Sequence, residues 1–417
     1  MARGRILLLV ILAGLLGACR PQQPTVVDFP FYAFRNTLNV ELLRVERTDT
    51  ATVLSMRAYS RPGWWISIDS LSFLYADGRR FPLHGAEGVV PGRHLYIRDA
   101  ETPGEGWVAF RLFFDPLPKR AERCDFLEGD SGGAFNILGI DLTGRPVQIA
   151  ADTDRAPAAD SLPAASREPG TTTVRVHIPV EGPWTETIAG YALVEGRRPG
   201  VVRQLPLRFG RDGVGEIRFR QARTAAVRMS LGDGIIQISC WTEPGETADV
   251  YWVPNSRFLT VRRLGLREAE APHVRYTGAY AAVNAQYGQN PQYRLDLSDP
   301  ALFRGVRTGA EFAGRVRQGY DAQHARLAAD PGLTPLQRDL AEVMLKGDVL
   351  RAMCTADDIL RLQYALDRGT DAGYRPVTLT DADFAWLATL GLPDSRLLFC
   401  DAVEYLSDPR IRPFVER

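Results

Sequence analysis

The spacing of apolar residues changes once along this chain, from a period of two to a period close to that of a helix. This change constrains the fold more than any other feature. Before about residue 255, apolar and polar residues alternate, as in Val108, Phe110 and Leu112, and such alternation places every second side chain on one face of a strand. From about Tyr276 onward, apolar residues recur at helical spacing. We therefore expect a β-rich part followed by a helical part.

The β-rich part divides into two blocks. In residues 26–150, Asp77-Gly78 lies between two apolar runs, and both residue types tolerate the positive φ of a tight hairpin. Residues 171–262 repeat the pattern, with turn signals at Asp212-Gly213 and Pro244-Gly245. Each block predicts an antiparallel β-sandwich.

Residues 151–170 separate these blocks and are rich in Ala, Pro, Ser and Asp. Such a segment buries too little apolar surface to offset the entropy lost on ordering. We expect a linker or a long exposed loop.

The remaining residues, 263–417, predict a helical region, or else the approach to a further domain. Thr308 with Glu311 and Thr334 with Gln337 have the spacing of capping boxes. Two further helices are expected, one that begins at Thr380 and one over residues 395–406.

The N-terminus predicts export. Residues 1–18 have two arginines, an apolar run and small residues, which is typical of a signal peptide. Residues 16–19, Leu-Gly-Ala-Cys, resemble the lipobox of bacterial lipoproteins. Cys19 would then carry palmitate-type acyl chains that hold the protein at a membrane, and residues 19–25 would be the tether. These features predict a lipid-anchored cell-envelope protein, periplasmic or surface-exposed, and the Arg20 after the cysteine favours the outer membrane.

The most conspicuous candidate for a catalytic motif is Gly-Asp-Ser-Gly-Gly at residues 129–133, which has the same sequence as the nucleophile loop of trypsin-like serine proteases. That mechanism needs a histidine to accept the Ser131 proton. His84 and His94 precede the motif, and neither has the sequence context of that family. We therefore disfavour a protease and interpret the motif as a glycine-rich turn.

Other chemistry finds little support. The five histidines are scattered, no Gly-rich nucleotide loop occurs, and fifty basic residues balance fifty acidic ones. The zero net charge gives no electrostatic basis for binding nucleic acid. The sequence predicts no catalytic residue, no metal and no cofactor, and an enzyme is the less favoured reading.

Four cysteines follow Cys19, and none is in a Cys-x-x-Cys pair. In an oxidising compartment they allow two bridges. The preferred disulfide joins Cys354 and Cys400, and the alternative is a pair of buried free thiols.

Aromatic residues are frequent in the first block, and they include Trp64, Trp65 and Trp107. In a sandwich such residues mostly form core and cross-strand pairs. The alternative is an exposed groove for a sugar or a peptide, which requires Trp64 and Trp65 to be accessible.

Several stretches resemble one family. They include residues 34–37, 48–54, 114–118, 124–135, 139–142, 243–246 and 250–252. These stretches are similar to the non-catalytic front part of thioredoxin-like (thiol-disulfide interchange) lipoproteins of Bacteroides-type bacteria. The resemblance implies an accessory region whose partner is a thioredoxin-like domain with Cys-x-x-Cys, and this chain has no such domain before Arg417.

The sequence as a whole predicts a lipid-anchored envelope protein with a binding, scaffolding or accessory role. Two alternatives stay open, a thiol-disulfide enzyme of unusual layout and a glycan- or peptide-binding surface lipoprotein. The expected partners are the membrane and a separate thioredoxin-like protein.

Overall fold

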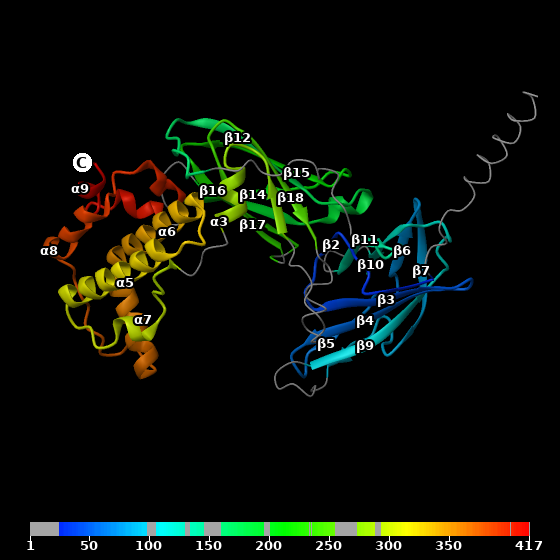
Figure 1. Cartoon of the computed structure of the whole chain (residues 1–417). Coiled ribbons are helices and arrows are strands. Elements are labelled where there is room, and N and C mark those ends of the chain that lie inside the picture. The colour runs from blue at the N-terminus through cyan, green and yellow to red at the C-terminus, as the bar shows by residue number, and fades with distance from the viewer. Residues whose placement is uncertain are drawn as a thin grey trace, which may run out of the picture.

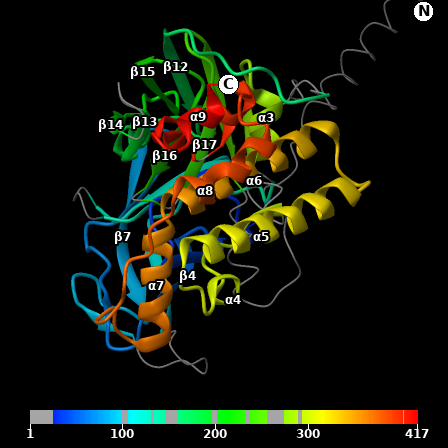
Figure 2. The ribbon, with the colours of Figure 1, turned by 90° about the vertical axis from the view of Figure 1, so that its left-hand side faces the viewer.

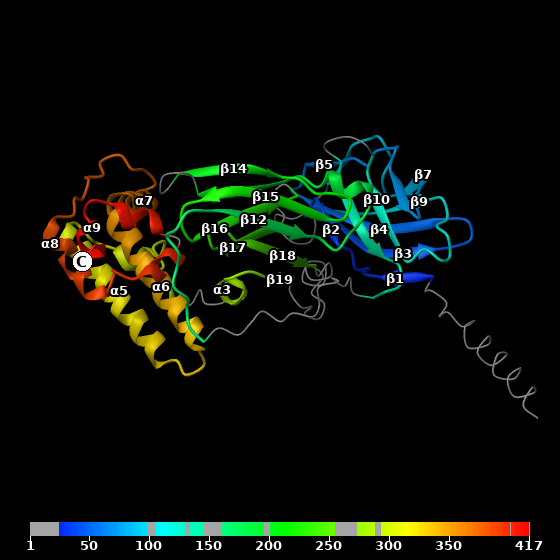
Figure 3. The same cartoon turned by 90° about the horizontal axis from the view of Figure 1, so that it is seen from above.

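The computed structural model describes residues 25–97, 106–129, 134–145, 160–195, 201–232, 234, 236–254, 273–287, 293–400 and 402–416. Three parts lie in a row, with a β part at one end, a second β part in the middle and a helical part at the other end (Figures 1 and 3). The predicted class, two β-sandwiches followed by helices, is confirmed.

The first sandwich is one antiparallel sheet of nine strands in the order β1-β3-β4-β9-β7-β6-β10-β11-β2. Its strands are β1 (Val26–Asp28), β2 (Phe34–Arg35), β3 (Val40–Arg47), β4 (Thr52–Ser60), β6 (Phe73–Ala76), β7 (Arg79–Glu87), β9 (Gly106–Phe114), β10 (Arg123–Leu127) and β11 (Asn136–Asp141). A two-stranded sheet is added by β5 (Trp65–Ile66) and β8 (Leu95–Tyr96).

This sheet folds over a core of its own. Phe114 on β9 and Phe126 on β10 come from the two halves of the sheet, and their rings meet edge to face at 6.0 Å. Both side chains are fully buried. The predicted hairpin is present, because Asp77 and Gly78 have φ values of 48° and 78° and connect β6 to β7.

The second sandwich has two four-stranded sheets, ordered β15-β12-β18-β19 and β14-β13-β16-β17. The strands are β12 (Gly170–His177), β13 (Gly190–Glu195), β14 (Val202–Leu207), β15 (Val214–Gln221), β16 (Ala225–Leu231), β17 (Ile236–Thr242), β18 (Thr247–Val253) and β19 (His273–Tyr276), with a 3-10 turn η1 (Pro183–Thr187).

Two details of this sandwich differ from the prediction. β12 and β18 pair in parallel, with Thr173 opposite Thr247, so the domain is not purely antiparallel. β19 lies in the range predicted to be helical and pairs with the outer edge of β18. A four-residue strand whose partner is distant in sequence leaves little periodic signal of its own.

The helical part contains α3 (Ala281–Tyr287), α4 (Pro300–Phe303), α5 (Gly309–Ala329), α6 (Pro335–Cys354), α7 (Ala356–Arg368), α8 (Asp381–Phe384), η3 (Ala385–Leu390), η4 (Ser395–Phe399), η5 (Val403–Ser407) and α9 (Arg412–Val415). α3 contacts β17, and η4 contacts β16, so this part is packed on the second sandwich (Figure 2).

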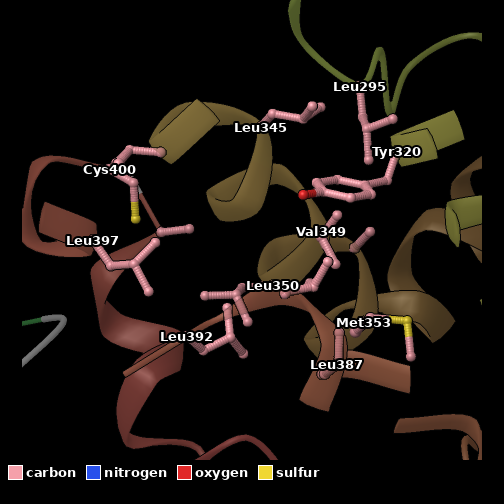
Figure 4. Close-up of a cluster of buried hydrophobic side chains, with 14 of the residues drawn as sticks. Leu295, Tyr320, Leu345, Val349, Leu350, Met353, Leu387, Leu392, Leu397 and Cys400 are labelled. Carbon is pink, nitrogen blue, oxygen red and sulfur yellow. The ribbon is translucent and has the colours of Figure 1, made fainter. Parts of the chain in front are cut away.

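The predicted capping boxes begin the two longest helices. Thr308 and Glu311 cap α5, and Thr334 and Gln337 cap α6. α6 lies at the centre of the helical core, where Leu345, Val349, Leu350 and Met353 face side chains from the later segments (Figure 4). No helix within the described residues is both long enough and apolar enough to span a bilayer.

The helix predicted over residues 395–406 is replaced by two short 3-10 segments, η4 and η5. Cys400 adopts an extended conformation between them, with φ −98° and ψ 154°. Its side chain packs beside Gly347 of α6. Tertiary packing at this residue therefore interrupts a segment that the apolar pattern alone would make helical.

The predicted linker is only partly described, since residues 151–159 lie outside the described residues. From Asp160 onward it is not exposed throughout, because Leu162 and Ala165 are buried in the helical core. The Leu162 N–H donates to Asp339 of α6 at 2.9 Å. The segment packs against residues far away in sequence, and its own composition does not reveal these contacts.

Candidate functional site

Four large aromatic side chains are exposed at one end of the first sandwich. Trp64 is 62% exposed, Trp65 50%, Tyr96 60% and Trp107 45%. We call these four residues the aromatic surface. Trp64 and Trp65 are therefore not core residues, although Trp65 forms a cross-strand pair with Tyr96, and the accessibility required by the alternative is present.

Local strand pairing positions this surface. Trp65 on β5 and Tyr96 on β8 are direct cross-strand partners, so their side chains share one face. β4 ends at Ser60 opposite Gly106, where β9 begins. β5, which follows β4 and pairs with β8, and the start of β9 therefore lie at the same end of the domain (Figure 1).

Neighbouring side chains hold two of the indoles in place. The His94 imidazole stacks on Trp65, with ring centroids 3.7 Å apart and planes 13° apart. The Arg57 guanidinium lies 4.2 Å from the centre of the Trp107 ring. Each contact covers one face of an indole and restricts its rotation, which leaves exposed apolar area of the kind that marks interaction sites.

A second concave site lies between the two sandwiches. A cleft of about 940 Å³ is lined by residues of both, which include Tyr75 and Asp125 from the first and His177, Glu181 and Tyr251 from the second. We call it the interdomain cleft. Pockets at domain junctions are a common location for ligand sites.

An apolar contact fixes the two walls of this cleft. Phe73, Leu127 and Leu138 of the first sandwich belong to the same buried cluster as the core of the second. The rings of Phe73 and Trp184 lie 5.3 Å apart across the junction. Gly139, with φ 67°, lies at this junction, where a Cβ would come within 3.4 Å of the Val180 side chain of the second sandwich.

Asp125 is the most unusual group in the cleft. It is 8% exposed, and one carboxylate oxygen accepts the Gly139 N–H at 2.7 Å. Burial raises the pKa of this carboxyl to about 6, and the hydrogen bond from Gly139 opposes the shift only in part. Among the described residues no cationic side chain pairs with this carboxylate, and carboxyl groups with a raised pKa in a cleft are candidates for functional sites.

The opposite wall carries a connected group. His177 Nε2 lies 2.7 Å from an Asp249 carboxylate oxygen. The imidazole stacks on Tyr251, with ring centroids 4.3 Å apart. The aspartate and the tyrosine together fix the orientation of the imidazole beside the cleft.

The four cysteines that the structure describes form no disulfide. Cys400 packs on Gly347, which lies seven residues before Cys354, or about 10 Å along the helix axis. A disulfide needs Cα atoms within about 7 Å, so the preferred Cys354–Cys400 bridge is not formed.

These thiols are also poorly suited to attack a disulfide. Burial raises the pKa of both the Cys124 and Cys240 thiols, and it raises the pKa of Cys354 to about 12. A low thiolate fraction slows thiol-disulfide exchange. The geometry therefore does not favour the thiol-disulfide alternative.

Other predicted positions are not brought into a site. Cys19 and Ser131 lie outside the described residues. Gly129 has a φ of 124°, as the glycine-rich turn requires at that position. His324 stacks on Tyr320 within α5 of the helical part, whereas His177 ends β12 of the second sandwich. Within the described ranges, no three His, Cys, Asp or Glu side chains gather as metal ligands.

No family model and no curated protein matches this chain. The resemblance to thioredoxin-like lipoproteins therefore stays a prediction. Among solved structures, pullulanase type I from Bacillus subtilis str. 168, complexed with maltose, is 12% identical with a TM-score of 0.19, over 47% of this chain and 24% of the pullulanase. CBMbc (family CBM26) from Eubacterium rectale Amy13K, in complex with maltoheptaose, is 10% identical with a TM-score of 0.17, over 52% of this chain and 94% of CBMbc.

This chain spans about a quarter of the length of the pullulanases that it matches. Likenesses with TM-scores this low carry no argument about function. The functional argument therefore rests on the residues of the aromatic surface and of the interdomain cleft.

Sequence reasoning identified the first of these sites as an alternative and missed the second. Trp64 and Trp65 are adjacent in sequence and easy to notice, whereas Asp125, His177 and Tyr251 come from three strands that are far apart in sequence. His177 ends an alternating run, and Asp77 and Asp212 begin turn signals, but none of these local patterns indicates that the three residues line one cleft.

Proposed function

We propose that this chain is a lipid-anchored cell-envelope protein that binds glycans through the aromatic surface of its first sandwich. The observation that carries this proposal is that Trp64 and Trp65 are at least half exposed and lie at the same end of the first sandwich as the exposed Tyr96 and Trp107.

The chemistry of the surface suits sugars. The face of an indole carries negative electrostatic potential, and the C–H bonds on one side of a pyranose ring carry positive potential. A sugar ring therefore stacks on an indole while its hydroxyls stay hydrated. Trp65 is already oriented by His94, so less rotational freedom is lost on binding.

The test is affinity electrophoresis of the full chain in gels that contain one soluble polysaccharide each, with an α-glucan, a β-glucan, a xylan and a mannan as probes. We expect at least one to retard the protein. In the variant W64A/W65A the apparent Kd for that polysaccharide should rise tenfold or more, so the protein is no longer retarded.

The matched control is Leu366→Ala, which removes another exposed apolar side chain, on α7. It should migrate like the unchanged protein. If no polysaccharide retards the chain, or if W64A/W65A binds as well as the parent, glycan binding at this surface is refuted. If a peptide ligand retards the chain and no polysaccharide does, glycan binding at this surface is likewise refuted.

The anchor is tested separately. Cells fed a clickable palmitate analogue should label the protein, and Cys19→Ala should abolish the label. The separate thioredoxin-like partner stays a prediction, which co-purification of the anchored protein from membranes would check.

A further inference from the structure

The interdomain cleft is independent of the aromatic surface, and we infer that it binds a small organic cation, either a polyamine or a basic peptide, through a protonated amine or guanidinium. Three observations carry this inference: the charge of the lining, the open oxygen of Asp125, and the fixed walls.

The lining is acidic. Carboxylates outnumber guanidinium groups five to two along the cleft. One of the two cations, Arg120, already lies 3.6 Å from the Asp77 carboxylate. Glu122, Asp125, Glu181 and Asp212 therefore face a concave, partly desolvated space that concentrates negative potential and attracts cations.

The second observation is independent of this charge. Only one oxygen of the Asp125 carboxylate accepts a hydrogen bond from the described part of the chain, namely Oδ1 from the Gly139 N–H. The residue is more than nine-tenths buried and lines the cleft. The other oxygen, Oδ2, accepts no hydrogen bond from the described residues and is not fully enclosed by protein atoms, so an N–H group of a ligand in the cleft can reach it and form a charge-assisted hydrogen bond.

The walls add apolar contact. Tyr75 on β6 is the cross-strand partner of Asp125 on β10, and Tyr251 on β18 lines the opposite side. Tyr75 is held edge to face against Trp184, with ring centroids 5.6 Å apart. Aromatic rings beside carboxylates are a good environment for the methylene groups and the charge of an organic cation.

The site is also preformed. Because the buried cluster that contains Phe73 and Leu127 joins both sandwiches, the two walls do not need to close before a ligand binds. Preorganisation lowers the entropy lost on binding.

Isothermal titration calorimetry of the full chain at pH 7.5 and low salt tests this inference. The probes are spermidine and a tri-lysine peptide. We expect one equivalent of at least one probe to bind, with affinity that falls as salt is added. Binding of spermidine alone assigns a polyamine ligand, and binding of the peptide alone assigns a basic peptide. Either result supports the cation site.

Asp125→Asn should weaken binding at least tenfold, and Glu181→Gln should weaken it several-fold. The matched control is Asp321→Asn, which removes one exposed carboxylate from α5 and should leave affinity unchanged. The inference is overturned if neither cation binds, if Asp125→Asn binds like the parent, or if Asp321→Asn weakens binding equally.

W64A/W65A separates the two proposals. This variant should keep the parent's affinity for the cation, whether or not its affinity for glycans falls. Loss of cation binding in W64A/W65A would place the cation on the aromatic surface and would overturn the cleft assignment.

Discussion

The side chain of Asn284 pairs with both backbone groups of Trp241. Its amide oxygen accepts the Trp241 N–H at 2.6 Å, and its amide nitrogen donates to the Trp241 carbonyl at 2.9 Å. β17 is an edge strand of its sheet, so this asparagine on α3 takes the place of a neighbouring strand. The contact joins the helical part to the second sandwich.

Asn284→Ala should therefore destabilise the protein. It leaves two buried backbone groups of Trp241 without this partner, and each such loss costs about 1–3 kcal/mol. We expect urea denaturation to show a decrease of about 2–4 kcal/mol in the free energy of unfolding. Asn39→Ala, at an exposed position, is the control and should change it by less than about 0.5 kcal/mol. A similar effect of both substitutions would contradict the role of Asn284.

A partly buried ion pair, in which the aspartate is the buried member, anchors the segment before α4. Both guanidinium nitrogens Nε and Nη2 of Arg294 donate to Asp348, at 2.7 and 2.6 Å, and the Leu295 N–H donates to the same carboxylate. Asp348→Asn removes the negative charge of this pair and leaves Arg294 without its counterion. Loss of one partner at a buried site typically lowers the free energy of unfolding by about 3 kcal/mol. Thermal unfolding followed by circular dichroism measures the loss.

The control is Glu216→Gln, which breaks the exposed pair with Arg175. Exposed pairs contribute about 0–1 kcal/mol, so its transition should move little. Equal shifts for the two variants would show that burial of Asp348 does not matter.

Asp125 makes stability depend on pH in a defined direction. Burial raises the pKa of Asp125 in the folded protein to about 6, whereas an aspartate in the unfolded chain has its ordinary pKa of 3.8. As pH rises, the folded state therefore keeps this proton longer than the unfolded chain does. Between these two values the folded state binds more protons, so this group lowers stability as pH rises.

Asp125→Asn removes that dependence while it keeps an acceptor for the Gly139 N–H. The variant and the parent should be similar near pH 4, and the variant should be more stable by about 2–3 kcal/mol at pH 7. Urea titrations at both pH values check this. A variant that is less stable at pH 7 would contradict the assigned cause. A carboxylate that weakens the fold at neutral pH is what a ligand site can require.

The thiols should resist modification in the folded protein. In a Cys19→Ser chain at pH 7, maleimide should label fewer than one of the four remaining cysteines, because Cys124, Cys240 and Cys400 are buried. In denaturant maleimide should label all four cysteines, and mass spectrometry counts the labels on each chain. Rapid labelling of one thiol in the folded state would revive the thiol-disulfide alternative.

Much of this fold can be predicted from patterns of residues that are close in sequence. The Asp77-Gly78 turn and the boxes at Thr308 and Thr334 depend only on residues a few positions apart, and all three are present. The exceptions depend on distant partners. β19 needs the edge of β18, Leu162 needs its contacts with α6, and Cys400 needs the space above Gly347.

The sites divide in the same way. Trp64 and Trp65 are neighbours in sequence, so their joint exposure was foreseeable as one of two outcomes. Asp125 and His177 approach one cleft only because two sandwiches share a buried cluster. No spacing rule in one sequence encodes that approach.

The parallel pairing of β12 with β18 has a consequence for biosynthesis. β12 opens the second sandwich, and β18 is its last long strand, so a chain emerging from a ribosome or a translocon exposes one edge of β12 until β18 arrives. An open edge of this kind recruits other chains. Holdase chaperones should therefore matter most during the interval between the synthesis of these two strands.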